Sequence, residues 1–136
     1  MERKTEILNK IKGEGYPGKE VVVSLEEFFD GNEDDGSIGA NLYPDQPSLK
    51  NFYDTFKGMV SSGEVESIFV RIADAEDSDW FYTDTVYVIG NITLKEVKEM
   101  LKELKPDEIY SGWMYGMPVN LQNVKIDMPV YSVWWD

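Results

Sequence analysis

The fold is decided by residues 65–110, which read VESIFVRIADAEDSDWFYTDTVYVIGNITLKEVKEMLKELKPDEIY. Val65 to Ala73 and Thr85 to Ile89 are rich in β-branched and aromatic side chains, which is typical of strands. Residues 94–104 carry leucine and valine at helical spacing behind a Thr-x-x-Glu capping box, which predicts a helix. Glu108 to Tyr110 begins a further strand. The stretch therefore reads strand, strand, helix, strand.

The segment before this stretch adds a strand and the clearest helix. The helix opens at Pro47, and its apolar side chains fall on one face at three- and four-residue steps. A short strand is predicted at Ile38 to Leu42, so the order up to Tyr110 is β-α-β-β-α-β, which is typical of the ferredoxin-like split βαβ arrangement. We therefore expect one domain, residues 1–136, of the α+β class. It would hold a ferredoxin-like βαββαβ core with an antiparallel sheet, plus N- and C-terminal extensions.

The two extensions contain further elements. Thr5 to Lys12 has the spacing of an amphipathic helix, and Val21 to Val23 is a β-branched run that suits a strand. Ser24 to Glu27 has the form of a capping box, so that it either starts a helical turn or extends the strand. Val130 to Trp135 reads as a last strand. Because neighbouring strand positions face opposite sides, one of its two tryptophans should be core and the other more exposed.

The composition excludes many catalytic classes. The 136 residues contain 26 Asp and Glu against 13 Lys and Arg, a net charge of −13, and neither His nor Cys. Catalytic triads built on histidine, thiol chemistry and zinc or iron sites built on Cys and His are therefore excluded. The negative surface disfavours nucleic acid and anionic membranes and favours basic proteins. With no signal-like or membrane-length apolar run, we expect a cytoplasmic protein of bacterial type.

Three weaker motifs do not support a site. Gly13, Gly15 and Gly18 match G-x-G-x-x-G but follow a helix and precede a strand, the reverse of a dinucleotide site. The acidic loops beginning at Asp30 and Asp74 lack the glycine at the sixth position that an EF-hand loop needs. No pair of carboxylates stands out for acid–base chemistry. We therefore predict no catalytic residue, no metal and no cofactor.

The acidic residues concentrate in two stretches without Lys or Arg, from residue 20 to 49 and from residue 72 to 94. If Val21 to Ser24 is the first core strand, the two acidic loops lie at the same end of the sheet. If Ile38 to Leu42 is first, they lie at opposite ends. The candidate partner-binding residues are the acids of these loops and three tryptophans as apolar anchors: Glu26, Glu27, Asp30, Glu33, Asp34, Asp35, Asp74, Glu76, Asp77, Asp79, Trp80, Trp113 and Trp135.

The stretch from Ser24 to Leu42, SLEEFFDGNEDDGSIGANL, resembles a segment of small acidic bacterial proteins, some of which are similar to immunity proteins of polymorphic toxin systems. The resemblance implies a protein that binds and blocks a partner toxin, often a basic nuclease, and that needs no cofactor, histidine, cysteine or metal.

The leading hypothesis is therefore a non-enzymatic binding protein of the immunity or antitoxin type, which masks a basic protein partner. Two alternatives stay open. One is a small-ligand sensing or regulatory domain of ferredoxin-like type, and the other is a hydrolase or isomerase that uses two carboxylates. The sequence does not indicate the oligomeric state.

Overall fold

The computed structural model describes residues 2–75 and 80–136. Its helices are α1 (Glu2–Gly13), α2 (Leu25–Phe29), α3 (Leu49–Ser61) and α4 (Leu94–Leu101). Its strands are β1 (Val22–Ser24), β2 (Val65–Arg71), β3 (Thr85–Gly90), β4 (Glu108–Ser111) and β5 (Val130–Trp134). Short 3₁₀ helices are η1 (Ala40–Leu42), η2 (Lys102–Leu104) and η3 (Val119–Leu121). Within the described ranges, none of the helices combines the length and apolar character needed to cross a membrane.

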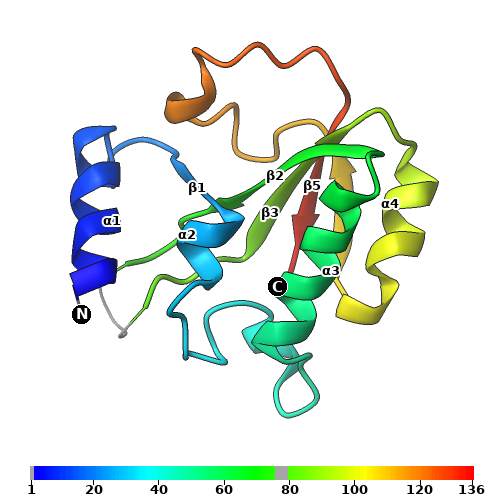
Figure 1. The fold of residues 1–136 in the computed structure, drawn as a ribbon, viewed down its shortest axis with the longest axis horizontal. Helices are drawn as coiled ribbons and strands as arrows, with labels where there is room; N and C mark the ends of the chain where they lie inside the picture. The colour runs from blue at the N-terminus through cyan, green and yellow to red at the C-terminus, as the bar shows by residue number, and fades with distance from the viewer. Residues whose placement is uncertain (1, 76–79) are drawn as a thin grey trace.

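The five strands form one sheet in the order β1-β2-β3-β5-β4, and every neighbouring pair is antiparallel (Figure 1). The α+β class with an antiparallel sheet is thus confirmed. Because β5 lies between β3 and β4, those two strands run parallel, and β3, α4 and β4 form a split βαβ unit. The first half differs, since β1 and β2 are direct antiparallel neighbours. The ferredoxin-like core is therefore not confirmed.

The predicted strand at Ile38 to Leu42 is wrong. Ala40 to Leu42 forms the 3₁₀ helix η1, and Gly39 before it has a φ of 67°, in the left-handed region. That backbone angle cannot continue a strand, and a Cβ at Gly39 would lie 2.9 Å from Phe52 Cζ, so that the position suits only glycine. The first strand of the sheet is instead β1, in the segment that the sequence had placed in the N-terminal extension.

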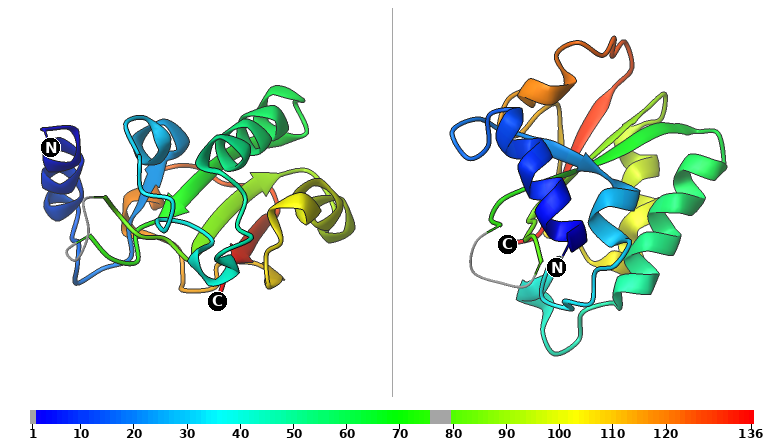
Figure 2. Two further views of the ribbon diagram at one scale, coloured as in Figure 1. Left: turned by 90° about the horizontal axis from the view of Figure 1, so that it is seen from below. Right: turned by 60° about the vertical axis from the view of Figure 1, so that its left-hand side comes forward.

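All four helices lie on one side of the sheet, as the left view of Figure 2 shows. They bury a single large core between helices and sheet, to which α1 contributes Ile7 and Ile11 and α3 contributes Phe52 and Phe56. The sheet contributes alternate side chains from each strand, as expected for one face of a pleated sheet. One row of this face runs through Val23, Val70, Val86, Val133 and Ile109 across all five strands.

The opposite face of the sheet is covered by the long segment between β4 and β5, residues 112–129, seen at the top of Figure 1. Its Leu121 forms a small second core with Val22 and Tyr87, and Trp113 and Met117 pack against it. The sheet is therefore apolar on both faces although α-helices cover only one of them.

Both capping boxes predicted from the sequence are present. The Ser24 hydroxyl accepts a hydrogen bond from the Glu27 N–H while the Glu27 carboxylate accepts one from the Ser24 N–H, and Thr93 and Glu96 form the same pair at α4. Of the two alternatives for residues 24–27, the helical turn is therefore correct. It ends β1 after three residues and directs the chain out of the sheet.

Candidate functional site

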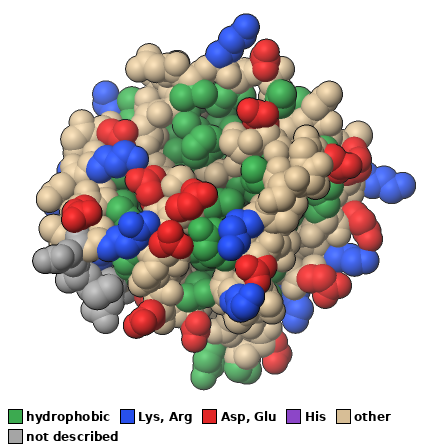
Figure 3. Space-filling model, viewed as in Figure 1, with side chains coloured by type: hydrophobic (Ala, Val, Ile, Leu, Met, Phe, Trp, Pro, Cys, Tyr) green, Lys and Arg blue, Asp and Glu red, His purple; other side chains and the backbone are tan. Residues whose placement is uncertain are grey.

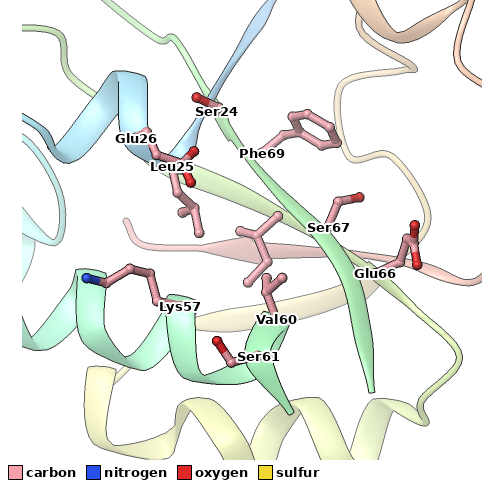
Figure 4. Close-up of a pocket in the computed structure, with 10 residues that line it drawn as sticks. Ser24, Leu25, Glu26, Lys57, Val60, Ser61, Glu66, Ser67 and Phe69 are labelled. Carbon is pink, nitrogen blue, oxygen red and sulfur yellow. The ribbon is translucent and has the colours of Figure 1, made fainter. Parts of the chain in front are cut away.

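A groove lies between α2, α3 and β2, with a cavity volume of about 410 Å³ (Figure 4). We call it the β2-edge groove. Its lining comes from the β1–α2 junction, from the last turns of α3 and from β2. The lining residues are Ser24, Leu25, Glu26, Lys57, Val60, Ser61, Glu66, Ser67, Ile68 and Phe69.

The groove exists because β1 is shorter than β2. β1 pairs with β2 only from Val22↔Arg71 to Ser24↔Phe69, and then the capping box at Ser24 turns the chain into α2. α3 closes the other side, anchored by its buried residues Phe52, Phe56 and Met59. Between the two helices, the edge of β2 from residue 65 to residue 68 is therefore not covered by a strand in the described part of the chain.

Acidic side chains stand at both ends of the β2-edge groove. Glu26 on α2 and Glu66 on β2 are exposed, and Figure 4 shows them on opposite sides of an apolar centre. Lys57 is the one basic residue among the ten that line the groove. Its Nζ lies 4.1 Å from the Tyr53 ring centroid and 3.8 Å from Asp54 Oδ1, so it is held along α3 by its own helix neighbours. The ends of the groove therefore present negative charge.

The described residues that flank the two acidic loops lie together, as expected when β1 is the first strand. The Trp80 indole N–H donates to the Phe28 carbonyl at 2.7 Å, and the Thr83 N–H donates to the Ser37 carbonyl at 2.9 Å. Asp74 is half-buried in a bridge with Tyr82. The candidate residues Glu76, Asp77 and Asp79 lie outside the described residues. In the described ranges, no three acidic side chains gather closely enough to hold a metal ion.

Basic residues of α1 contact the segment around the first acidic loop. Although this stretch of sequence contains no Lys or Arg, basic side chains from α1 therefore lie next to it in the fold. Arg3 Nε donates to the Asp30 carbonyl and Arg3 Nη2 to the Glu26 carbonyl, both at 2.8 Å. Lys10 Nζ pairs with Glu27 Oε2 at 2.8 Å. Figure 3 accordingly shows acidic and basic side chains interspersed on this face. The negative charge of these stretches is therefore partly offset by the basic residues of α1.

In the loop after α2, some acidic side chains form hydrogen bonds within the loop and others are exposed. Asp34 is half-buried, and its Oδ1 accepts the Gly36 N–H at 2.9 Å, which stabilises the turn. Glu33 and Asp35 on either side of it are exposed. Asp30 is exposed as well, with its Oδ1 3.4 Å from the Tyr53 hydroxyl. The outward charge of this end therefore comes from Glu26, Asp30, Glu33 and Asp35.

The expected tryptophan anchors are mostly core residues. Trp80 and Trp135 are each only 1% exposed, so the expectation that either contacts a partner is wrong for the folded chain. Each also uses its indole N–H internally, Trp135 by donating to the Leu104 carbonyl at 2.9 Å. Trp113 is half-buried and packs edge-to-face on Tyr87, with 4.8 Å between the ring centroids. Trp134 is half-buried beside buried Trp135, as the strand alternation predicted.

A second polar cluster surrounds Arg71 on the opposite face of the sheet. Arg71 Nε contacts Glu20 Oε1 at 2.6 Å and Nη1 contacts Asp84 Oδ1 at 3.0 Å. The guanidinium also lies under the Tyr115 ring, 3.7 Å from its centroid. Both carboxylates are thus engaged by Arg71, and the cluster ties residues 112–118 to the sheet. The role of this cluster is therefore structural.

The carboxylates and tyrosines whose pKa is shifted all have a pKa farther from 7 than the ordinary value for that group. Burial raises the pKa of Glu27, but hydrogen bonds from Lys10 and from the Ser24 backbone outweigh it and leave the pKa below its usual value. The ammonium of Lys50, hydrogen-bonded to Asp54, lowers the pKa of that carboxyl. Burial raises the pKa of three tyrosines above the ordinary value, namely Tyr53, Tyr82 and Tyr87.

The chain is similar to known proteins over most of its length. The model of the "Uncharacterized protein YfbO family" matches residues 2–133. A protein of Escherichia coli (strain K12), "Uncharacterized protein YfbO", is 31% identical over 116 residues, which cover 85% of this chain and 82% of that protein. No solved structure matches the chain. Because the family model spans nearly all of these elements, from α1 to β5, the chain belongs to the YfbO family.

Proposed function

We propose that this chain is a non-enzymatic binding protein of the immunity or antitoxin type, which masks a basic protein partner. The observation that carries the proposal is the β2-edge groove, a 410 Å³ hollow with exposed Glu26 and Glu66 at its ends, on a chain of net charge −13. An open, partly apolar hollow with charged ends is suited to a side chain or short segment of another protein.

The remaining acids support the same role. Glu33 and Asp35 are exposed in the loop that follows α2. Surface charge of one sign steers a partner of opposite charge and raises the rate of association more than the final affinity. Such a surface therefore promotes rapid capture of a basic protein, and the rate should fall as salt screens the field.

The polar groups of the chain support a binding role over a catalytic one. General acid–base catalysis works best with a group whose pKa lies near the working pH. Here the pKa values of the carboxylates Glu27 and Asp54 are lowered, and the pKa values of Tyr53, Tyr82 and Tyr87 are raised, so both sets lie farther from the working pH. The half-buried ion cluster serves internal pairing, because Arg71 engages Glu20 and Asp84 together.

A capture experiment with a matched variant tests the proposal. The purified chain is immobilised, native lysate is passed over it at low salt, and bound protein is released by a salt step and identified by mass spectrometry. The test variant reverses four exposed acids of the groove and loop: Glu26→Lys, Asp30→Lys, Glu33→Lys and Asp35→Lys. The control variant reverses four exposed acids elsewhere to the same net charge: Glu6→Lys, Glu64→Lys, Glu103→Lys and Glu108→Lys.

The expected result is a basic protein that the wild type and the control variant retain and that the test variant loses. For the purified partner, the association rate of the test variant should fall by about tenfold or more at low salt. Equal capture by both variants would show that the total charge, and not this surface, makes the contact. If no basic protein is retained by the wild type, the proposal fails.

A further inference from the structure

The edge of β2 inside the groove is an unfilled position in the sheet. β1 covers this edge only at Phe69, Val70 and Arg71, whereas β2 begins four residues earlier at Val65. Over those four residues the side of β2 that faces α2 has no strand beside it in the described part of the chain. At about 3.3 Å per residue, the open edge is roughly 13 Å long.

The backbone of Ile68 points its hydrogen-bonding groups into this opening. The Ile72 N–H donates to the Val21 carbonyl at 3.2 Å, so Ile72 faces β1. In an antiparallel ladder alternate residues direct their N–H and C=O to the same edge. The N–H and C=O of Val70, which pairs with Val23, therefore point to the β1 side, and so do those of Ile68 two residues earlier. Ile68 lies beyond Phe69, which pairs with Ser24, the last residue of β1. By this alternation its N–H and C=O face the groove side of β2, where an added strand would pair with them, and Ile68 is 4% exposed in the free chain.

The other free edge of this half of the sheet is protected. The outward-facing Val22 has its N–H bonded to Asn120 Oδ1 at 3.1 Å and its C=O bonded to Asn120 Nδ2 at 2.7 Å. A side-chain amide thus occupies the place that a strand would take beside β1. Protection of exposed edges is common, since an open edge recruits other chains. Within this half of the sheet, the contrast leaves the β2 edge as the position that accepts a strand.

The charges beside the open edge select the occupant. Exposed Glu26 and Glu66 stand at the two ends, while Leu25, Val60 and Ile68 make the floor apolar. A second copy of this chain would bring the same acids against each other, which is unfavourable. A segment with lysine or arginine on both sides of an apolar residue matches both the charges and the floor.

We propose that the β2-edge groove binds an extended segment of the basic partner by strand addition, with main-chain hydrogen bonds to Ile68 and basic side chains near Glu26 and Glu66. This inference rests on the proposed function and specifies how the partner is held. Main-chain pairing supplies affinity in this mode, and side-chain pockets supply the choice of sequence. The register shift of β2 between Val65 and Ser67 limits the paired stretch to a few residues.

The test uses a capped hexapeptide of alternating lysine and valine as the probe. Its fully N-methylated analogue has the same side chains and charge but cannot donate main-chain hydrogen bonds. Hydrogen exchange of backbone amides is followed by NMR on the whole chain, and affinity is measured by titration. We expect the plain peptide to slow exchange of the Ile68 amide by tenfold or more and to bind at least tenfold more tightly than the analogue.

A pair of charge variants locates the contact. Glu26→Lys with Glu66→Lys should lower the affinity for the plain peptide by tenfold or more, whereas Glu6→Lys with Glu103→Lys should leave it within about twofold at moderate salt, because screening weakens distant charges. All four positions are exposed, and circular dichroism checks that the fold is retained.

Two results would overturn strand addition. One is equal affinity for the plain and N-methylated peptides, and the other is unchanged exchange at Ile68 in the bound state. Either result together with successful capture of a basic protein would refute the mode of binding and leave the proposed function standing. Absence of binding by both peptides also overturns strand addition, and absence of capture in addition overturns the proposed function.

Discussion

Replacement of Asn120 by alanine tests how the outer edge of the sheet is held. The Asn120 amide bonds both the N–H and the C=O of Val22, and its Nδ2 also lies 3.2 Å from Glu14 Oε1. Asn120 belongs to η3 in the segment that covers the second face of the sheet. Asn120→Ala therefore releases the edge of β1 and loosens the attachment of that segment.

The magnitude follows from the two main-chain bonds. Each intramolecular hydrogen bond contributes about 1 kcal/mol net, so their joint loss should lower the free energy of unfolding by about 2 kcal/mol. Unfolding entropy of about 2.1 cal/mol/K per residue makes 1 kcal/mol worth about 3.5 °C in a chain of 136 residues. The expected fall in Tm is therefore about 7 °C.

Urea denaturation followed by tryptophan fluorescence measures the free energy, and differential scanning calorimetry measures Tm. Asn123→Ala is the matched control, because Asn123 is an exposed amide three residues further along the same segment. It should change stability by less than about 0.5 kcal/mol. A change for Asn120→Ala that is no larger than that of the control would refute the role given to this amide.

Two further predictions concern α2 and its contacts. Glu27→Gln should lower stability by about 0.5–1 kcal/mol at pH 7, because a carboxylate pairs with Lys10 more strongly than an amide does. Since the pKa of Glu27 is lowered from 4.5 on folding, this contribution is complete above about pH 5 and is lost as the pH falls through the lowered pKa, so urea curves of variant and wild type should converge in acid. Trp80→Phe should cost at least about 1–3 kcal/mol, because the Phe28 carbonyl loses its buried donor, whereas Trp134→Phe at a half-buried position should cost less; equal losses in urea denaturation would contradict this account.

Local signals in the sequence predicted most of the elements. The capping boxes at Ser24 and Thr93 mark where α2 and α4 begin, because the pattern itself is the set of hydrogen bonds that starts the helix. The Ile38 strand failed for a local reason as well. Its apolar residues suit a strand, but Gly39 adopts a left-handed angle that alternation of side chains does not reveal.

The sequence pattern did not predict which strands lie next to each other in the sheet. The order β-α-β-β-α-β fits β1 to β4 as well as the expected set, yet the insertion of β5 between β3 and β4 depends on a strand from the far end of the chain. For the same reason the β2-edge groove carries no motif. It arises from the difference between a three-residue β1 and a seven-residue β2, and strand register is not visible in either segment alone.

The candidate acids were predicted only in part. Glu26, Glu33 and Asp35 are exposed as expected, but Arg3 and Lys10 lie more than fifteen positions away in sequence from the carbonyl and carboxylate groups they contact. A count of charges along the chain cannot place a helix beside a loop. Glu66 was missed because it lies within a strand outside both acidic stretches, and its importance appears only when the open edge beside it is known.

An open sheet edge is a hazard for a chain that must stay folded and dispersed, because it pairs readily with other chains. The two acids beside the β2 edge address this hazard, since Glu26 and Glu66 of one copy repel those of another. The same charges would attract the basic segment proposed above, so one arrangement both discourages self-association and favours the proposed partner. Salt screens both effects and therefore acts on the two associations in opposite directions.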